Sequence, residues 1–131
     1  MIDCENEVYT AIAKGLREKF TDINIAGEYV KAPSSFPHVS ITQSDNAVVA
    51  ENMTGASEMV QVMFEINVYS NKTGGKKTEC KSIMKVIDDI LFRKNFKRIA
   101  LTPVANLEDA TIYRLTARYR AMTDGTYFYR R

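Results

Sequence analysis

The chain has 131 residues, of which 45% are hydrophobic and 26% are charged, a size and composition that predict one domain spanning 1–131. No run of about 18 apolar residues occurs, so we expect no membrane span, and the acidic start at Met1–Glu5 lacks the apolar stretch of a secretion signal. The formal net charge is only +2, yet residues 1–70 are acidic and residues 71–98 and 112–131 are basic. This distribution fits either solvated faces or a subunit with opposite poles that is suited to head-to-tail contact.

The first part of the chain predicts one helix and two strands, followed by a long connection. Apolar residues recur every four positions over Asp3–Phe20, as in an amphipathic helix, with its first residue as the N-cap and Gly15 marking a close approach to a sheet. A short strand is expected at Ile25–Val30 and a β-branched strand at His38–Gln43, separated by a proline-containing connector. Ser44–Gly55 is expected to be a projecting hairpin tip or a long loop, an element that often binds partners.

The stretch Ser57–Leu91 is the unit on which the rest of the chain is expected to pack. Every second residue from Val60 to Val68 is apolar, which is the pattern of a strand with one buried face. A turn at Ser70–Gly75 ends this strand. Apolar residues then recur at three- and four-residue steps up to Leu91, which predicts a helix whose buried stripe lies on the sheet.

The last third of the chain predicts further strands. Pro103, inside a strand expected at Arg98–Val104, indicates an edge position or a bulge. Thr111–Met122 alternates, so that its tyrosine and alanine side chains share one face and its arginines share the other. After the hairpin turn Asp124–Gly125, residues 126–131 either pair as a final short strand or extend freely.

Together these elements predict an α+β fold. Strands that are joined by tight turns favour antiparallel pairing, and two helices of this length would cover one face of the sheet. We therefore expect a two-layer domain with a mostly antiparallel sheet, two helices on one face and the order α-β-β-β-α-β-β. A loop or hairpin at about 44–57 would project from it.

The motifs that could carry chemistry all fall short of a catalytic site. Gly74–Lys76 lies between a strand and a helix, as in a phosphate-binding loop, but Ser70 and Lys77 stand where that motif needs a glycine and a hydroxyl residue. The sole histidine, His38, has no nucleophile near it in a known pattern, and two distant cysteines do not form a metal site. We expect no enzymatic activity, cofactor or metal. A nucleotide-dependent enzyme is the alternative that the glycine turn leaves open.

The arginines of the late strand are the best candidates for a functional surface. Arg114, Arg118 and Arg120 would project from the bare sheet face, opposite the helices. Such a face could bind nucleic-acid phosphates, but modules of that kind also carry base-stacking aromatic residues there, and the tyrosines of this strand lie on the opposite face. Cross-strand pairing, for example with Glu65, and a subunit interface are the two other interpretations.

Several segments give the chain a recognisable layout: an N-terminal helix, Phe36–Val39, a turn-rich loop, the strand end Phe64–Asn71, a helix opened by Gly74–Lys77 and carrying Ile87–Leu91, and a strand with Tyr113–Tyr119. This layout covers nearly the whole chain and resembles the tail terminator, or tail completion, proteins of tailed bacteriophages and of contractile phage-tail-like particles. It is also similar to head–tail connector proteins.

The resemblance implies a structural virion protein that forms a homo-oligomeric ring, commonly a hexamer. Such a ring caps the tail tube, ends tail polymerisation and offers a docking surface to the head or collar. The implied partners are the tail tube protein, the sheath of a contractile tail, and a connector or collar protein, with DNA at most passing through the lumen. The implied location is a virion or tail-like particle that is assembled in the cytoplasm of a bacterial host. A small nucleic-acid-binding module is the remaining alternative.

Candidate residues for a subunit or tube interface come from the loop, the arginine row with its acidic neighbour, and the C-terminus. They are Asp45, Val48, Val49, Glu51, Met53, Glu65, Arg114, Arg118, Arg120, Tyr127, Tyr129 and Arg130.

Overall fold

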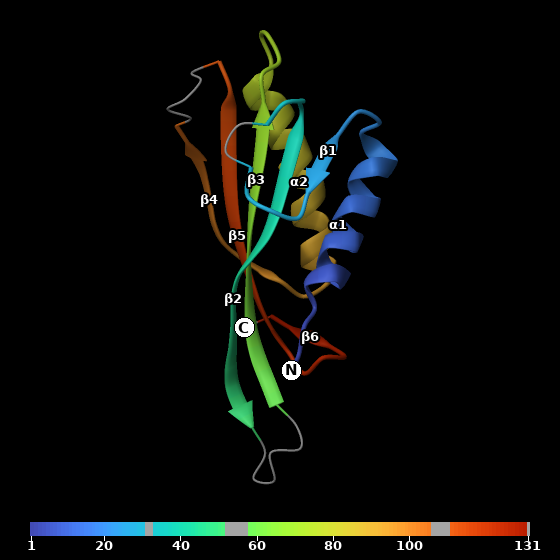
Figure 1. Ribbon diagram of the computed structural model, residues 1–131, viewed down its shortest axis with the longest axis vertical. Coiled ribbons are helices and arrows are strands. Elements are labelled where there is room, and N and C mark those ends of the chain that lie inside the picture. Colours follow the sequence, from blue (N-terminus) through green and yellow to red (C-terminus); the bar gives the residue numbers. More distant parts are fainter. Residues whose placement is uncertain (31–32, 52–57, 106–110, 131) are drawn as a thin grey trace.

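The computed structural model describes residues 1–30, 33–51, 58–105 and 111–130, and within them two helices lie on one face of a six-stranded sheet (Figure 1). The helices are α1 (Glu5–Lys19) and α2 (Lys76–Arg93). The strands are β1 (Asn24–Ala26), β2 (His38–Glu51), β3 (Glu58–Ser70), β4 (Lys97–Val104), β5 (Tyr113–Thr123) and β6 (Phe128–Tyr129). The predicted α+β class and the predicted order of elements are confirmed.

The sheet has the order β1-β2-β3-β5-β4, with β6 paired to β5. β1 pairs with β2 in parallel, whereas every other pair of neighbouring strands is antiparallel. β4 lies at one edge, which confirms the edge position indicated by Pro103. Because β3 lies between β2 and β5, it is hydrogen-bonded on both sides along most of its length.

The hydrophobic core lies between the helices and the sheet. Alternate residues of β3 from Val60 to Val68 are buried, as the period-2 pattern predicted. The stripes of α1 and α2 that face them are also buried, and Phe96, which follows α2, packs edge-on against Phe64 with 5.8 Å between ring centroids. Burial of these side chains is the main source of stability for the two-layer arrangement.

The first helix starts and packs differently from the prediction. It begins at Glu5 with Cys4 as the N-cap residue, while the Asp3 carboxylate accepts the Glu5 backbone N–H at 3.1 Å. A Cβ placed on Gly15 would lie 2.4 Å from Cδ1 of Ile90 in α2. Gly15 therefore marks the close approach of the two helices, and the expected approach to the sheet is wrong.

The second strand is much longer than predicted. β2 continues past Gln43 to Glu51, so the residues expected to begin a loop at Ser44 are strand residues. Two register shifts, between Gln43 and Asp45 and between Val48 and Ala50, interrupt its pairing with β3. β2 and β3 form a long hairpin whose end projects beyond both helices (Figure 1). Residues 52–57 lie outside the described part.

The projecting part of this hairpin is bonded to the start of the chain. The backbone N–H of Ile2 donates to Oε1 of Glu58 on β3 at 3.2 Å. The Asn46 side chain on β2 donates to the Ile2 carbonyl oxygen at 2.9 Å. Both strands of the hairpin are thus bonded to one residue that lies just before α1.

Two other predicted boundaries change. The first strand covers only Asn24–Ala26, at the start of the range expected to reach Val30. At the other end of the chain, β6 pairs with β5, so the C-terminal residues take the strand alternative rather than the extended one. The Arg130 guanidinium donates to the carbonyl oxygens of Phe92 and Phe96 and lies 3.9 Å from the centre of the Phe92 ring.

Neither described helix is long and apolar enough to cross a membrane.

The contact between Gly15 and Ile90 gives a testable consequence. Gly→Ala inside a helix normally stabilises by about 1 kcal/mol, but here the new methyl group would collide with Ile90 Cδ1. We expect Gly15→Ala to stabilise the Ile90→Val variant, which lacks that atom, by about 1 kcal/mol more than it stabilises the parent chain. Urea denaturation of the four proteins measures this coupling. Thr10→Ala, at an exposed position of α1, is the control and should have the same effect in both backgrounds; equal effects of Gly15→Ala in both would contradict the proposed collision.

Candidate subunit interface

The sheet face opposite the helices carries the predicted arginine row, and we call it the arginine face. It comprises Glu65 and Asn67 of β3 together with Arg114, Thr116, Arg118 and Arg120 of β5. The antiparallel register places Glu65 opposite Arg118 and Asn67 opposite Thr116. The alternation predicted for β5 therefore brings the candidate residues of two strands together.

Cross-strand pairing of the arginine row with Glu65, one of the interpretations of the sequence, is found for Arg118. Nη2 of Arg118 lies 3.4 Å from Oε1 of Glu65. The Arg118 side chain is 57% exposed and that of Glu65 is 25% exposed. An ion pair open to solvent to this degree contributes less than about 1 kcal/mol to stability, so much of the hydrogen-bonding capacity of Arg118 remains available to a partner.

Arg114 is held much more firmly by its own chain. Its Nε donates to Oδ1 of Asn67 at 2.9 Å, and the Thr116 hydroxyl donates to the same oxygen at 2.6 Å. Asn67 is fully buried, although it lies on the face that the helices leave open. The Arg114 guanidinium also lies 5.4 Å from the centre of the Tyr29 ring and 5.7 Å from that of Tyr69. These contacts make Arg114 a structural residue of the face.

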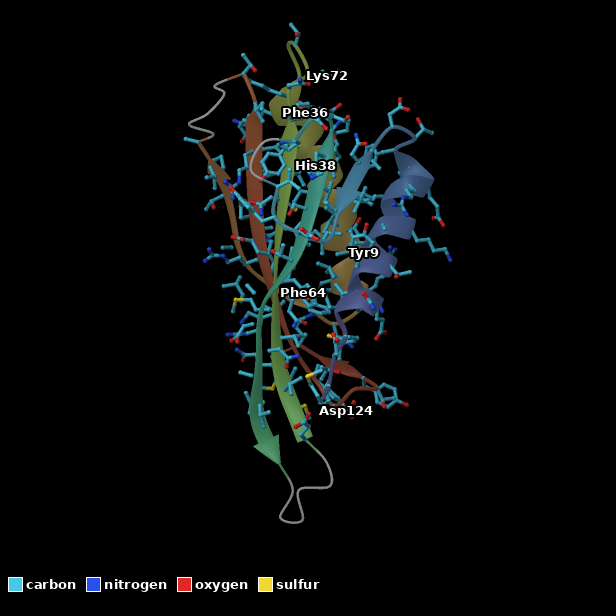
Figure 2. The ribbon with its side chains drawn as sticks, viewed as in Figure 1. Tyr9, Phe36, His38, Phe64, Lys72 and Asp124 are labelled. Carbon is cyan, nitrogen blue, oxygen red and sulfur yellow. The ribbon has the colours of Figure 1, made fainter. Side chains whose placement is uncertain are left out.

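One end of the arginine face is covered, which corrects the expectation of a bare sheet. The segment between β1 and β2 contacts β5 through Tyr29, and the Ser40 hydroxyl of β2 donates to the Glu28 carbonyl oxygen at 2.7 Å. Phe36 and His38 lie at this same end of the sheet (Figure 2). The part of the face around Arg118 and Arg120 extends beyond this cover. Tyr69 of β3 also lies on this face, opposite Arg114, but it is buried and so offers no surface on which a nucleic-acid base could stack.

The candidate residues of the hairpin lie on its projecting part. Asp45 and Arg120 both lie opposite Met63, on either side of it, so the three residues form one row across the sheet. Val48 and Val49 are 51% and 44% exposed, although both are apolar. Glu51 is the last residue of β2, and Met53 lies outside the described residues.

The C-terminal candidates are mostly engaged within the chain. The Tyr129 hydroxyl donates to Oδ2 of Asp124 at 3.3 Å, and Arg130 donates to the carbonyl oxygens of Phe92, in the last turn of α2, and of Phe96. Tyr127 is 66% exposed, compared with 38% for Tyr129. The three residues do not lie with the arginine row, so the structure divides the predicted interface set into separate surfaces.

The sequence did not reveal a groove that lies between α2 and β4. Its volume is about 440 Å³, and its floor is formed by Met84 and Leu115, which are buried. Leu101 of β4 forms one wall and is 41% exposed. Charged residues surround this apolar floor: Lys81, Lys85, Asp88, Asp89 and Arg98. Leu101 is exposed because β4 and α2 are separated at this position. The separation of two elements in space leaves no pattern in the sequence, so the groove could not be predicted.

The motifs that were weighed for chemistry have structural partners. The Ser70 hydroxyl donates to Glu79 at 2.6 Å, which places a carboxylate in the first turn of α2, beside the glycine turn considered for phosphate. Asp88 accepts a hydrogen bond from the buried Tyr119 hydroxyl at 2.9 Å, and burial holds the pKa of that tyrosine well above its usual range. Within the described ranges, no group of three potential metal ligands comes together.

Comparison with known proteins bears on the fold. No protein-family model matches the chain, and no curated protein matches its sequence. A solved structure described as "Virion of native gene transfer agent (GTA) particle" contains a chain that superposes with a TM-score of 0.62 at 16% sequence identity. The match covers 89% of this chain and 94% of that chain. At this identity the likeness establishes a shared fold that extends over nearly the whole of both chains.

Two substitutions on the arginine face should separate its structural residues from its exposed ones. Asn67→Ala leaves the buried Thr116 hydroxyl and Arg114 Nε without their acceptor, so we expect a loss of about 2 kcal/mol or more in the free energy of unfolding. Arg118→Ala removes an exposed pair and should cost less than about 1 kcal/mol. Chemical denaturation measures both values. Similar losses for the two variants would contradict the division of the face described above.

His38 gives the protein a specific acid sensitivity. Its side chain is buried, its Nε2 has no hydrogen-bond partner among the described residues, and burial lowers its pKa below the usual 6.5. The unfolded chain therefore binds the proton more readily, so the free energy of unfolding should fall as the pH drops from about 7 to 5. Because His38 is the only histidine, we expect His38→Gln to flatten this dependence in urea denaturation at each pH. An unchanged slope in the variant would exclude His38 as its cause.

Proposed function

We propose that this chain is a structural subunit of a phage-like particle, and that copies of it form a ring on the end of the tail tube. The ring would stop tail polymerisation and offer a docking surface to the head or collar. The observation that carries the proposal is the likeness to a chain of a gene transfer agent virion, which extends over 89% of this chain and 94% of that one. Because only the fold is shared at 16% identity, the assignment to a tail terminus rests on the sequence layout and on surface features.

The surface supports a role in assembly. Four apolar side chains are more than 40% exposed on strands of this small domain, on the hairpin and on β4: Val48, Val49, Ile99 and Leu101. They form two separate pairs, one on each element, and contiguous exposed apolar patches mark sites of contact with other proteins. The hairpin is acidic and α2 is basic, so the two regions suit contacts between unlike surfaces of neighbouring copies.

The proposed role is not enzymatic. His38 is buried against Tyr69, and Cys4 and Cys80 are buried thiols whose pKa values are raised by burial, so none of the three is a reactive side chain in an open site. The proposed partners are copies of the same chain, most simply in a hexamer, the tail tube protein, the sheath of a contractile tail and a connector or collar protein. DNA would at most pass through the lumen, and the proposed location is a virion or tail-like particle assembled in the host cytoplasm.

A second candidate is another head–tail connector protein of the neck, because a shared virion fold supports a connector as well as a terminator. The two functions differ in where the subunit binds. A terminator binds the end of a tail tube in the absence of a head, whereas a connector binds the head and leaves free tubes unchanged.

Assembly on isolated tubes tests the proposal. We expect native mass spectrometry of the purified chain, alone and with tail tubes from the same genome, to detect a closed ring of one subunit number. Electron microscopy should show that ring on one end of each tube, and tube protein polymerised with it should yield shorter tubes than tube protein alone. A chain that remains monomeric and leaves tube length unchanged would refute the proposal. Binding to heads alone would favour the connector.

A further inference from the structure

We propose that the projecting β2–β3 hairpin of one subunit docks in the α2–β4 groove of the next subunit. The inference rests on the proposed ring and specifies the contact that would close it. The occupant of the groove is therefore a second copy of this chain, bound head to tail. The argument uses the shape and chemistry of the two surfaces and their positions in the fold.

The groove is suited to an apolar strand segment. Its floor of Met84 and Leu115 is apolar, and the side chain of Leu101 extends along one wall with 41% of its surface exposed. Ile99, on the same strand, is 44% exposed. β4 is also an edge strand, so its outer N–H and C=O groups have no partner strand within the described sheet. A partner segment could bury the leucine and pair with this edge.

The rim of the groove favours an acidic partner. Lys81 and Lys85 are exposed on α2, one turn apart, and line the groove. Of the two acidic residues that line it, Asp88 is already bonded to the Tyr119 hydroxyl at 2.9 Å and to Arg98 at 3.3 Å, whereas Asp89 is exposed. With Arg98, the lining carries three cations and two carboxylates, so it has an excess of one positive charge.

The hairpin supplies the complementary chemistry. Val48 and Val49 are half exposed on its projecting part, and Asp45 is exposed beside them. Residues 44–58 contain three acidic residues, Asp45, Glu51 and Glu58, and no lysine or arginine. An apolar segment flanked by carboxylates matches an apolar floor flanked by lysines, and matched charges of this kind select one partner surface over others.

The two surfaces cannot meet within one subunit. The hairpin ends beyond the helices at one end of the molecule, whereas α2 and β4 extend toward the other end (Figure 1). The groove lies between these two elements. Contact between them joins unlike surfaces of two copies, which is the heterologous geometry that generates rings. A two-fold dimer could contain the same contact only as a reciprocal exchange of the two hairpins, and it would stop at two copies, so the length of the crosslinked ladder separates a dimer from a ring.

Disulfide trapping tests the contact. The native thiols give little background, because burial raises the pKa of Cys4 to about 11 and that of Cys80 to about 12. We expect Val48→Cys mixed with Leu101→Cys, the two carrying tags of different size, to form a mixed dimer on oxidation. The double variant should form a ladder up to the ring. Val48→Cys mixed with Lys14→Cys, an exposed position on α1, is the matched control and should form no mixed dimer.

The outcomes separate this inference from the proposed ring. Native mass spectrometry of the parent chain reports the ring independently of any cysteine. A ring whose subunits give no Val48–Leu101 crosslink, or crosslink equally through Lys14→Cys, would overturn the hairpin contact and leave the ring standing. Crosslinking of Val48→Cys to itself or only to tube protein would also overturn it, since the occupant would then be different. Both substituted residues are at least 41% exposed, and thermal denaturation checks that each variant is folded.

Discussion

Pairing of β3 on both of its edges is the constraint on which the rest of this structure depends. Side chains alternate along a strand, so the register with β2 and β5 decides which residues face the helices and which face away. A slip of one residue would expose Phe64 and bury Glu65 beneath the helices. The hydrogen bonds from Arg114 and Thr116 to Asn67 stabilise the same register, because only this alignment of β3 and β5 places the Asn67 side chain beside both donors.

The elements with strong periodicity could be predicted from the sequence, and the irregular ones could not. β3, β5 and the two helices have regular apolar spacing, so their predicted bounds agree with the observed ones to within a few residues. The length of β2 was missed because register shifts near Asp45 and Val49 interrupt the alternation, and Asp45–Asn46 has the composition of a turn. The neighbour of Gly15 was misjudged because a glycine reports close packing but not the element that packs.

The candidate surface shows the same division. Pairing between Glu65 and an arginine of β5 could be considered from the sequence, because these residues lie on the polar faces of long, regular strands, but the sequence did not specify Arg118. The cover that Tyr29 provides for Arg114 could not, since the path of a connector depends on tertiary contacts such as that of Ser40 with Glu28. The α2–β4 groove likewise arises from the angle between two elements. The relative positions of the candidate residues could thus be predicted where two regular strands meet, and they could not be predicted where the chain is irregular.

The two hydrogen bonds made by the main chain of Ile2 have a mechanical consequence. They join both strands of the hairpin to a residue that lies three positions before α1, and α1 in turn packs against α2. The hairpin is therefore connected to the helix layer through the N-terminal segment as well as through the sheet, so the position of the hairpin and that of α1 depend on each other.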